Sequence, residues 1–168
     1  MDFRADYLVG EKVEVGMSAL YTLLIAMSPI SELRGAIPIA LTLYQLPLPS
    51  ALFWSILGNM LPVFLILWLL PPLSSWLSER FLCFKRFFDW LFQYTRKRHN
   101  QKFEIYKDLA LVILVAIPLP FTGAWTGSLA AFVFGIPYKK AVPLIFLGVL
   151  IAATLVTLAT LGIINLAR

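Results

Sequence analysis

The sequence has few of the side chains on which most catalytic and metal sites depend. It contains one cysteine, Cys83, and one histidine, His99, so no internal disulfide and no Cys/His metal cluster can form. His99 lies in a basic run, residues 96–99, where a solvated loop is expected rather than a metal ligand. No catalytic Ser-His or Cys-His arrangement and no phosphate-binding glycine loop is present. The sequence therefore argues against an enzyme, and no cofactor is expected.

Charged residues are also scarce, at 14% of the chain, whereas 60% of the residues are hydrophobic and the mean hydropathy is +0.84. Soluble domains are roughly half apolar, so we expect a multi-pass membrane protein. The net charge of +5 could suggest nucleic acid, but the basic residues adjoin apolar segments. Membrane lipids are therefore the expected partner, and nucleic acid is not. Residues 1–6 lack the basic stretch of a cleavable signal peptide, so the first apolar segment is expected to stay in the mature protein.

The chain contains two similar patterns. In each pattern an apolar run ends at a proline-containing break, a second apolar run follows, and a longer apolar segment comes last. Matching positions lie 90 residues apart: Tyr44/Phe134, Pro47/Pro137 and Gly58/Gly148. Hydrophobic segments broken by Pro and Gly at corresponding positions of two halves are typical of inverted-repeat transporters, whose substrate site lies at the breaks. The pattern therefore favours transport.

Segment length separates the broken pairs from the full spans, because a helix needs roughly 20 apolar residues to cross a bilayer. The short runs are 15–27, 33–44, 109–117 and 124–135, and the long ones are 51–70 and 142–167. Each short pair forms either one kinked span or a re-entrant hairpin. Hairpins place Lys139, Lys140 and the basic loop 79–108 on one side of the membrane, as the positive-inside rule favours. We therefore prefer re-entrant hairpins.

We predict an all-α integral membrane fold with two inverted repeats, each a re-entrant helical hairpin followed by a transmembrane helix, joined by an amphipathic cytoplasmic helix. The prediction is a single membrane domain, residues 1–168, with repeat one at 13–72, an amphipathic and basic connector at 73–107 and repeat two at 108–167. Within the connector, apolar residues recur at helical spacing, which suits a helix in the head-group region. Packing of this face on the bundle is the alternative. Cys83 is expected on the cytoplasmic side and both termini on the other.

Glu32 and Arg34 are the charged residues of the first break. A charge near the bilayer centre costs at least ~2.5–3.5 kcal/mol and persists mainly beside a partner or a water-filled cavity. Ser31, after Pro29, is placed to cap the next helix, whose N-terminus favours anions. On a regular helix Glu32 and Arg34 point to nearly opposite faces and would not neutralise each other. We predict a phosphate or carboxylate between Arg34 and the helix end; pairing of both residues with other protein groups, or an interfacial position, is the alternative.

The second break carries no charge and offers Thr122, Gly123, Trp125 and Thr126. Thr122 is placed to cap a helix, and the glycines allow close approach of a ligand or another helix. By symmetry this break is predicted to face the first across the site, with small-residue packing through Gly123 and Gly127 as the alternative. Asn59, inside the first long span, is expected to make an interhelical hydrogen bond rather than to bind a ligand.

Two motifs, Glu-Leu-Arg-Gly-Ala-Ile-Pro at residues 32–38 and Pro-Leu-Pro-Phe-Thr-Gly-Ala at residues 118–124, resemble those of the bacterial and archaeal small multidrug export protein family. The resemblance covers nearly the whole chain, and the family name implies drug export. More distantly, the chain is similar to the DedA/VTT superfamily, whose members are linked to undecaprenyl-phosphate recycling and lipid scrambling. Those proteins commonly place an acidic residue and an arginine in their hairpins. Glu32 and Arg34 match this in the first hairpin, and the second hairpin departs from it.

The predicted function is transport across a bacterial or archaeal plasma membrane of a small amphiphile or lipid with an anionic phosphate head group, such as a polyprenyl phosphate, by alternating access. Arg34 would hold the anion, and Glu32 would couple transport to protons or sodium. One alternative is export of cationic amphiphiles with Glu32 as counter-ion, and another is a non-transporting membrane scaffold or chaperone subunit. Because hairpin backbone must be shielded from lipid, a homodimer or larger homo-oligomer is expected.

Overall fold

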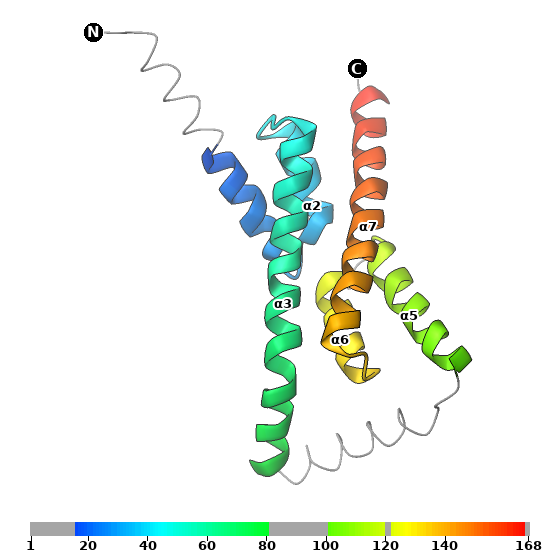
Figure 1. Cartoon of the computed structure of the whole chain (residues 1–168). Coiled ribbons are helices and arrows are strands. Elements are labelled where there is room, and N and C mark those ends of the chain that lie inside the picture. Colours follow the sequence, from blue (N-terminus) through cyan, green and yellow to red (C-terminus); the bar gives the residue numbers. More distant parts are fainter. Residues whose placement is uncertain (1–15, 81–100, 120–121, 167–168) are drawn as a thin grey trace. The chain divides into compact units, whose positions relative to one another are not determined.

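The structure, a computed structural model, describes residues 16–80, 101–119 and 122–166. Within these ranges all regular secondary structure is helical, as the sequence predicts (Figure 1). The helices are Gly16–Met27, α2 (Glu32–Thr42), α3 (Leu48–Arg80), α5 (Gln101–Ala116), α6 (Ala124–Val133) and α7 (Tyr138–Leu166). The predicted basic loop, with Cys83 and His99, lies largely outside the described residues, as do residues 1–6.

Two of these helices are long and apolar enough to cross a membrane. α3 has 33 residues and α7 has 29, whereas a helix of about 20 residues already covers the ~30 Å of a hydrocarbon core. Both coincide with the long runs predicted as spans. The helices α2, α5 and α6 have 11, 16 and 10 residues, which is too short to cross.

The helix α3 continues beyond the predicted span. It includes Pro71 and Pro72 and ends at Arg80, so its last turns occupy the start of the segment predicted as a separate connector. The carbonyl oxygen of Pro71 accepts hydrogen bonds from the hydroxyls of Ser74, at 2.8 Å, and Ser75, at 3.1 Å. Serine hydroxyls on helices commonly bond in this way to a carbonyl of the preceding turn. The carbonyls that lose their helical donor because of Pro71 and Pro72 are those four residues earlier, of Leu67 and Trp68. The helix α5 likewise begins within the predicted connector, at residue 101.

The two short helices beside each break fold back on each other as a hairpin (Figure 1). In the second pair α5 contacts α6, and Lys140 at the start of α7 forms an ion pair with Asp108 of α5. In the first pair the rings of Tyr21 and Tyr44 stack with their centroids 6.2 Å apart. A single kinked span would hold residues on either side of the break far apart. Each pair therefore folds back at its break, and the arrangement of the two pairs as inverted, re-entrant repeats stays a prediction.

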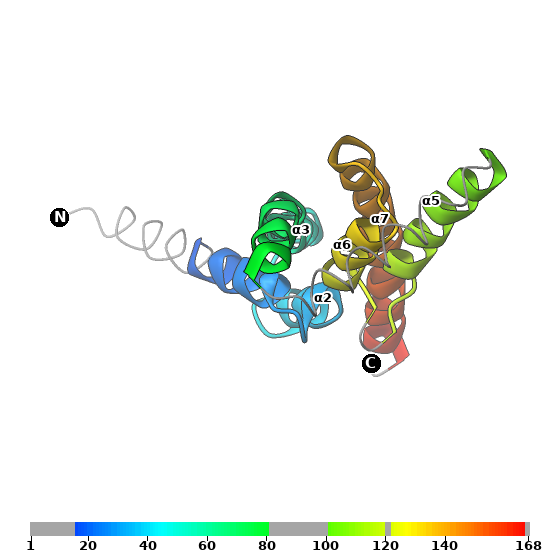
Figure 2. The same cartoon turned by 90° about the horizontal axis from the view of Figure 1, so that it is seen from below.

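The chain divides into two compact units, which are described separately. Unit 1 comprises residues 1–59 and 153–168, so it holds the first hairpin, the first turns of α3 and the end of α7. Unit 2 comprises residues 60–152 and holds the rest of α3, the second hairpin and the first half of α7. Figure 2 shows α6 of unit 2 close to both α5 and α7. A Cβ built on Gly127 of α6 would overlap Val115 of α5 and lie 3.8 Å from Ile145 of α7.

Each long helix packs closely, at a glycine, against the first helix of the hairpin that precedes it in the chain: α3 against Gly16–Met27, and α7 against α5. A Cβ built on Gly58 of α3 would overlap the carbonyl oxygen of Leu23 and lie 2.9 Å from the Cβ of Ala26. A Cβ built on Gly148 of α7 would lie 2.7 Å from the Cβ of Val115. Carbon atoms of two residues do not approach so closely without displacement, so each crossing requires glycine. The contacts correspond along the chain, because Ala26 and Val115 lie 89 residues apart and the two glycines 90.

Candidate functional site

Glu32 opens α2 in a backbone conformation that is unusual for its residue type. Its φ is 45°, in the left-handed region, which costs a non-glycine residue about 1–2 kcal/mol. Its N–H donates to the carbonyl oxygen of Ser28 at 3.0 Å, and only 4% of the residue is exposed. Strained backbone combined with a buried acid is more frequent at functional sites than elsewhere. Glu32 is therefore a candidate functional residue.

Arg34 lies beside Glu32. Its Nη2 atom is 3.7 Å from Oε2 of Glu32, and its side chain is 23% exposed against 6% for that of Glu32. The expected separation of the two side chains on opposite helix faces is not observed, because the left-handed φ of Glu32 departs from helical geometry. A direct charge-assisted hydrogen bond would be about 2.7–2.9 Å long, so the pair is held by charge at a longer distance. Arg34 is the more accessible partner.

Ser31 stands at the N-cap position of α2, but the predicted cap is not formed. Its φ and ψ are −90° and −44°, and its side chain makes no capping hydrogen bond. A capping side chain requires an extended backbone instead. The hydroxyl donates to the carbonyl oxygen of Ile25 at 3.2 Å, so Ser31 fastens the break to the preceding helix. Pro29 is exposed at this turn.

Thr122 in the second break does not cap α6 either. The N-cap residue is Gly123, with a φ of 143° that favours glycine. The Thr122 hydroxyl lies 2.7 Å from the carbonyl oxygen of Ile117 and accepts from the N–H of Leu119 at 3.1 Å. The neighbouring Thr126 hydroxyl donates to the carbonyl of Gly123 at 3.2 Å. Both hydroxyls thus stabilise the break itself.

The predicted site residues fall into two groups, one in each unit. Pro29, Ser31, Glu32 and Arg34 lie together in the first break, and Thr122, Gly123, Trp125 and Thr126 in the second. Trp125 is half-buried in the first turn of α6. That the two breaks face each other across one site stays a prediction.

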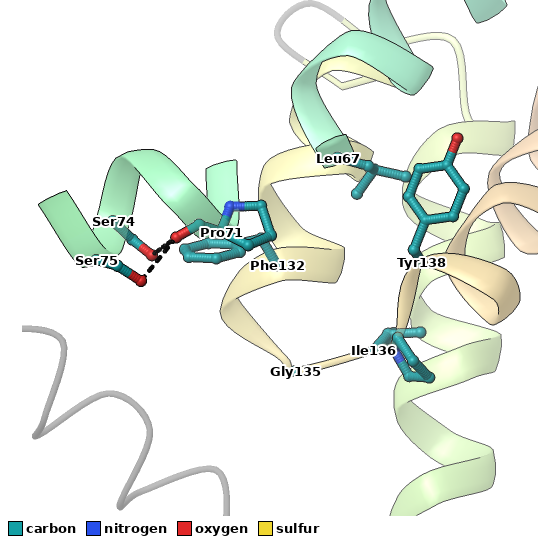
Figure 3. Close-up of a pocket in the computed structure, with 9 residues that line it drawn as sticks. Leu67, Pro71, Ser74, Ser75, Phe132, Gly135, Ile136 and Tyr138 are labelled. Atoms are coloured by element: carbon teal, nitrogen blue, oxygen red, sulfur yellow. Dashed lines mark hydrogen bonds between the residues drawn. The ribbon is translucent and has the colours of Figure 1, made fainter. Parts of the chain in front are cut away.

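A cavity of about 370 Å³ lies in unit 2, apart from the predicted residues (Figure 3). Its lining comes from the end of α3 and from the turn between α6 and α7: Leu67, Pro71, Ser74, Ser75, Phe132, Gly135, Ile136, Pro137 and Tyr138. The serine hydroxyls are directed to the Pro71 carbonyl. The remaining lining is mainly apolar, so the cavity suits a hydrocarbon group better than a charged one. Sequence patterns missed it because its walls come from segments far apart in the chain.

Two buried polar residues of α3 lie outside the predicted set. Ser55 is fully buried and Asn59 is 2% exposed. The Ser55 Oγ and Asn59 Oδ1 atoms have no hydrogen-bond partner among the described residues. The interhelical hydrogen bond expected of Asn59 is thus not made by its Oδ1 within that part of the chain. The sequence feature that could have identified them is their spacing: two polar residues four positions apart in an apolar span lie on one face of a helix.

The comparison with protein families gives a match that begins within the first break and contains the whole of the second. Residues 32–155 match the family described as "Putative small multi-drug export protein". The matched segment covers more than half of the chain and contains Glu32, Arg34 and all the predicted residues of the second break. Comparisons with curated proteins and with solved structures find no match.

Proposed function

Because the chain belongs to this family of small multi-drug export proteins, we propose that it is a transporter in the plasma membrane of a bacterium or archaeon. Two helices long and apolar enough to span a bilayer support a membrane location. The proposed cargo is a small amphiphile or lipid with an anionic phosphate head group, such as a polyprenyl phosphate. Transport would proceed by alternating access.

The Glu32–Arg34 pair is the observation that carries this proposal. Arg34 is the more exposed of the two charges, which favours an anionic cargo over a cationic one. A guanidinium presents five N–H donors in a planar fork, so it can remain 3.7 Å from Glu32 and also grip a phosphate through two hydrogen bonds. Glu32, nearly enclosed by protein, is the residue that would couple transport to protons or sodium.

The proposed architecture is a pair of inverted repeats, each a re-entrant hairpin followed by a spanning helix. Similar local geometry at corresponding positions supports it. Gln45 and Gly135, 90 residues apart, both have a positive φ, of 49° and 64°. The next turns are also alike, because Ala51 donates to the Pro47 carbonyl at 3.0 Å and Ala141 to the Pro137 carbonyl at 2.9 Å.

Two rival functions remain distinct from this proposal. Export of cationic amphiphiles, with Glu32 as the counter-ion, agrees with the family's description. A non-transporting scaffold or chaperone subunit does not require the strained, buried Glu32, so this residue argues against that function. For any of these we propose a homodimer or larger homo-oligomer, and a monomeric mass in nanodiscs with activity retained would contradict that assembly.

Substitutions at the pair test the function in liposomes. Arg34→Ala should lower transport of a phosphorylated polyprenyl lipid about 30-fold or more, since truncating one member of a buried charge pair costs about 2–5 kcal/mol. Arg34→Lys should restore it only in part, because a point charge replaces the planar fork. Arg80→Ala is the matched control. Arg80 lies at the end of α3, 5.7 Å from the ring of Trp76, and its loss should leave transport unchanged.

Glu32→Gln separates the two cargo classes. On the proposed function it should weaken the dependence of lipid transport on a proton or sodium gradient. Transport of a cationic dye that survives Arg34→Ala but disappears with Glu32→Gln would instead assign cationic export. If the protein moves neither cargo and neither substitution alters any gradient-driven flux, the scaffold is favoured.

A further inference from the structure

Buried hydroxyls on the described helices have a regular partner, and Ser55 is an exception. The buried hydroxyls of Thr22, Ser128 and Thr160 each donate to the carbonyl oxygen four residues earlier, at 2.7–2.8 Å. Ser55 is fully buried, yet its Oγ makes no such bond and has no other partner among the described residues. A buried hydroxyl without a partner is costly. The arrangement is explained if Ser55 binds something that is not part of the chain.

Two further groups that carry an oxygen atom follow Ser55 within about one turn of α3. Asn59 follows Ser55 by four residues, is 2% exposed, and has an unpartnered Oδ1 among the described residues. Pro62 lies inside α3 and has no N–H, so it cannot donate to the carbonyl oxygen of Gly58 as a regular helix requires. Positions 55, 58 and 59 are neighbours on a helix surface. Three oxygen-bearing groups, a hydroxyl, an amide and a carbonyl, therefore occur within about one turn of α3.

This turn packs against the helix that leads into the charged break of unit 1. Gly58 packs against Leu23 and Ala26, in the last turn before the first break. Figure 1 shows the helix Gly16–Met27 running obliquely toward α3. The contact of Gly58 with Ala26 lies two residues before the break that begins at Ser28.

The chemistry of these oxygens indicates a small hard cation. Oxygen ligands suit such cations, and backbone carbonyls freed by helix breaks coordinate sodium in membrane transporters. The three oxygens are uncharged, which suits a monovalent ion better than a divalent one. Thr157 of α7, in the same unit, also has a buried and unpartnered Oγ1 among the described residues, and it could supply a fourth oxygen.

We propose that Ser55, Asn59 and the Gly58 carbonyl bind a sodium ion that enters with the anionic cargo. Glu32 and Arg34 together carry no net charge, so an anionic head group alone would leave one uncompensated negative charge in a medium of low dielectric constant. A sodium ion in the same unit compensates that charge. Binding of the ion follows from the three oxygens, whereas its coupling to cargo rests on the proposed transport function.

Thermal unfolding of the purified protein in sodium, potassium and choline chloride at equal ionic strength tests the site. Sodium should raise the Tm of the unaltered protein in a concentration-dependent way. Ser55→Ala and Asn59→Ala should each abolish the sodium-specific rise. In choline, Ser55→Ala should unfold at or above the Tm of the unaltered protein, because no hydrogen bond is lost. Ser128→Ala is the matched control, since this fully buried serine donates to the Ala124 carbonyl, and it should keep the sodium effect.

A Tm that does not distinguish sodium from potassium and choline would overturn the site, as would a sodium effect that survives both substitutions. Isothermal titration with sodium chloride separates loss of the ion from loss of the fold in the variants. Sodium binding without any cargo transport would sustain the site and contradict the proposed function. Lipid transport that proceeds equally without sodium would sustain the function and overturn the coupling.

Discussion

Two described residues other than glycine have a positive φ, and they differ in what surrounds them. Glu32, at 45°, is buried and paired with Arg34, whereas Gln45, at 49°, is exposed in the turn after α2. The strain at Glu32 positions a charge. At Gln45 the same conformation only reverses the direction of the chain, a task for which glycine is better suited.

Gln45→Gly should therefore stabilise the protein by up to about 1 kcal/mol. It removes a left-handed penalty of about 1–2 kcal/mol, and the greater freedom of glycine in the unfolded chain offsets part of that gain. The reciprocal change, Gly135→Gln, places a side chain at a φ of 64° and should lower stability by about 1–2 kcal/mol. Chemical unfolding in detergent measures both. A loss of stability in Gln45→Gly would mean that its side chain contributes more than the strain costs.

The residues of the first break could be selected from the sequence, but their arrangement could not. Charge inside an apolar pattern identified Glu32 and Arg34, because such residues are costly in a membrane. Their proximity depends on a left-handed backbone that helical periodicity does not encode. The cap expected at Ser31 is missing because its own backbone is helical rather than extended, which its residue type does not reveal. The unpartnered oxygens of Ser55 and Asn59 depend on which neighbours tertiary packing supplies, so spacing alone did not reveal them.

Among the elements, the closest packing occurs where the long helices cross the hairpins. Gly58→Ala should lower the stability by about 1–3 kcal/mol, because its Cβ would overlap the Leu23 carbonyl and press on Ala26. Gly162→Ala is the control: among the described residues, no atom outside the adjoining stretch of α7 lies within 4 Å of its Cβ position. Alanine also favours a helix by about 1 kcal/mol over glycine. Equal effects of the two substitutions on unfolding would contradict the close crossing.

The helices themselves were largely predictable, since every apolar run of the sequence analysis corresponds to a described helix. Runs of apolar residues mark the part of a helix that faces lipid or protein, but not where the helix stops. This is why α3 passes through Pro71 and Pro72 to Arg80, and why α5 begins in a polar stretch at Gln101.

For the whole molecule, the hairpins and the distribution of basic residues together predict a topology. The Lys140–Asp108 pair joins the start of α7 to α5, so both sides of the second break belong at the same membrane face. Cys83 should therefore resist a membrane-impermeant thiol reagent on intact cells, and tags at both termini should be accessible from outside. Tags are needed because burial of Cys83 would mimic protection. A C-terminal tag on the cytoplasmic side would exclude the re-entrant arrangement.

The division into two units has a consequence for the order in which the protein is made. Unit 2 is one continuous stretch, residues 60–152, whereas unit 1 joins residues 1–59 to residues 153–168. Because a chain emerges from the ribosome N-terminus first, unit 2 can pack before synthesis ends. The first hairpin is synthesised earlier, but unit 1 can finish packing only after the final turns of α7 have been synthesised. Synthesis of unit 1, which contains Glu32 and Arg34, thus begins before that of unit 2 and ends after it.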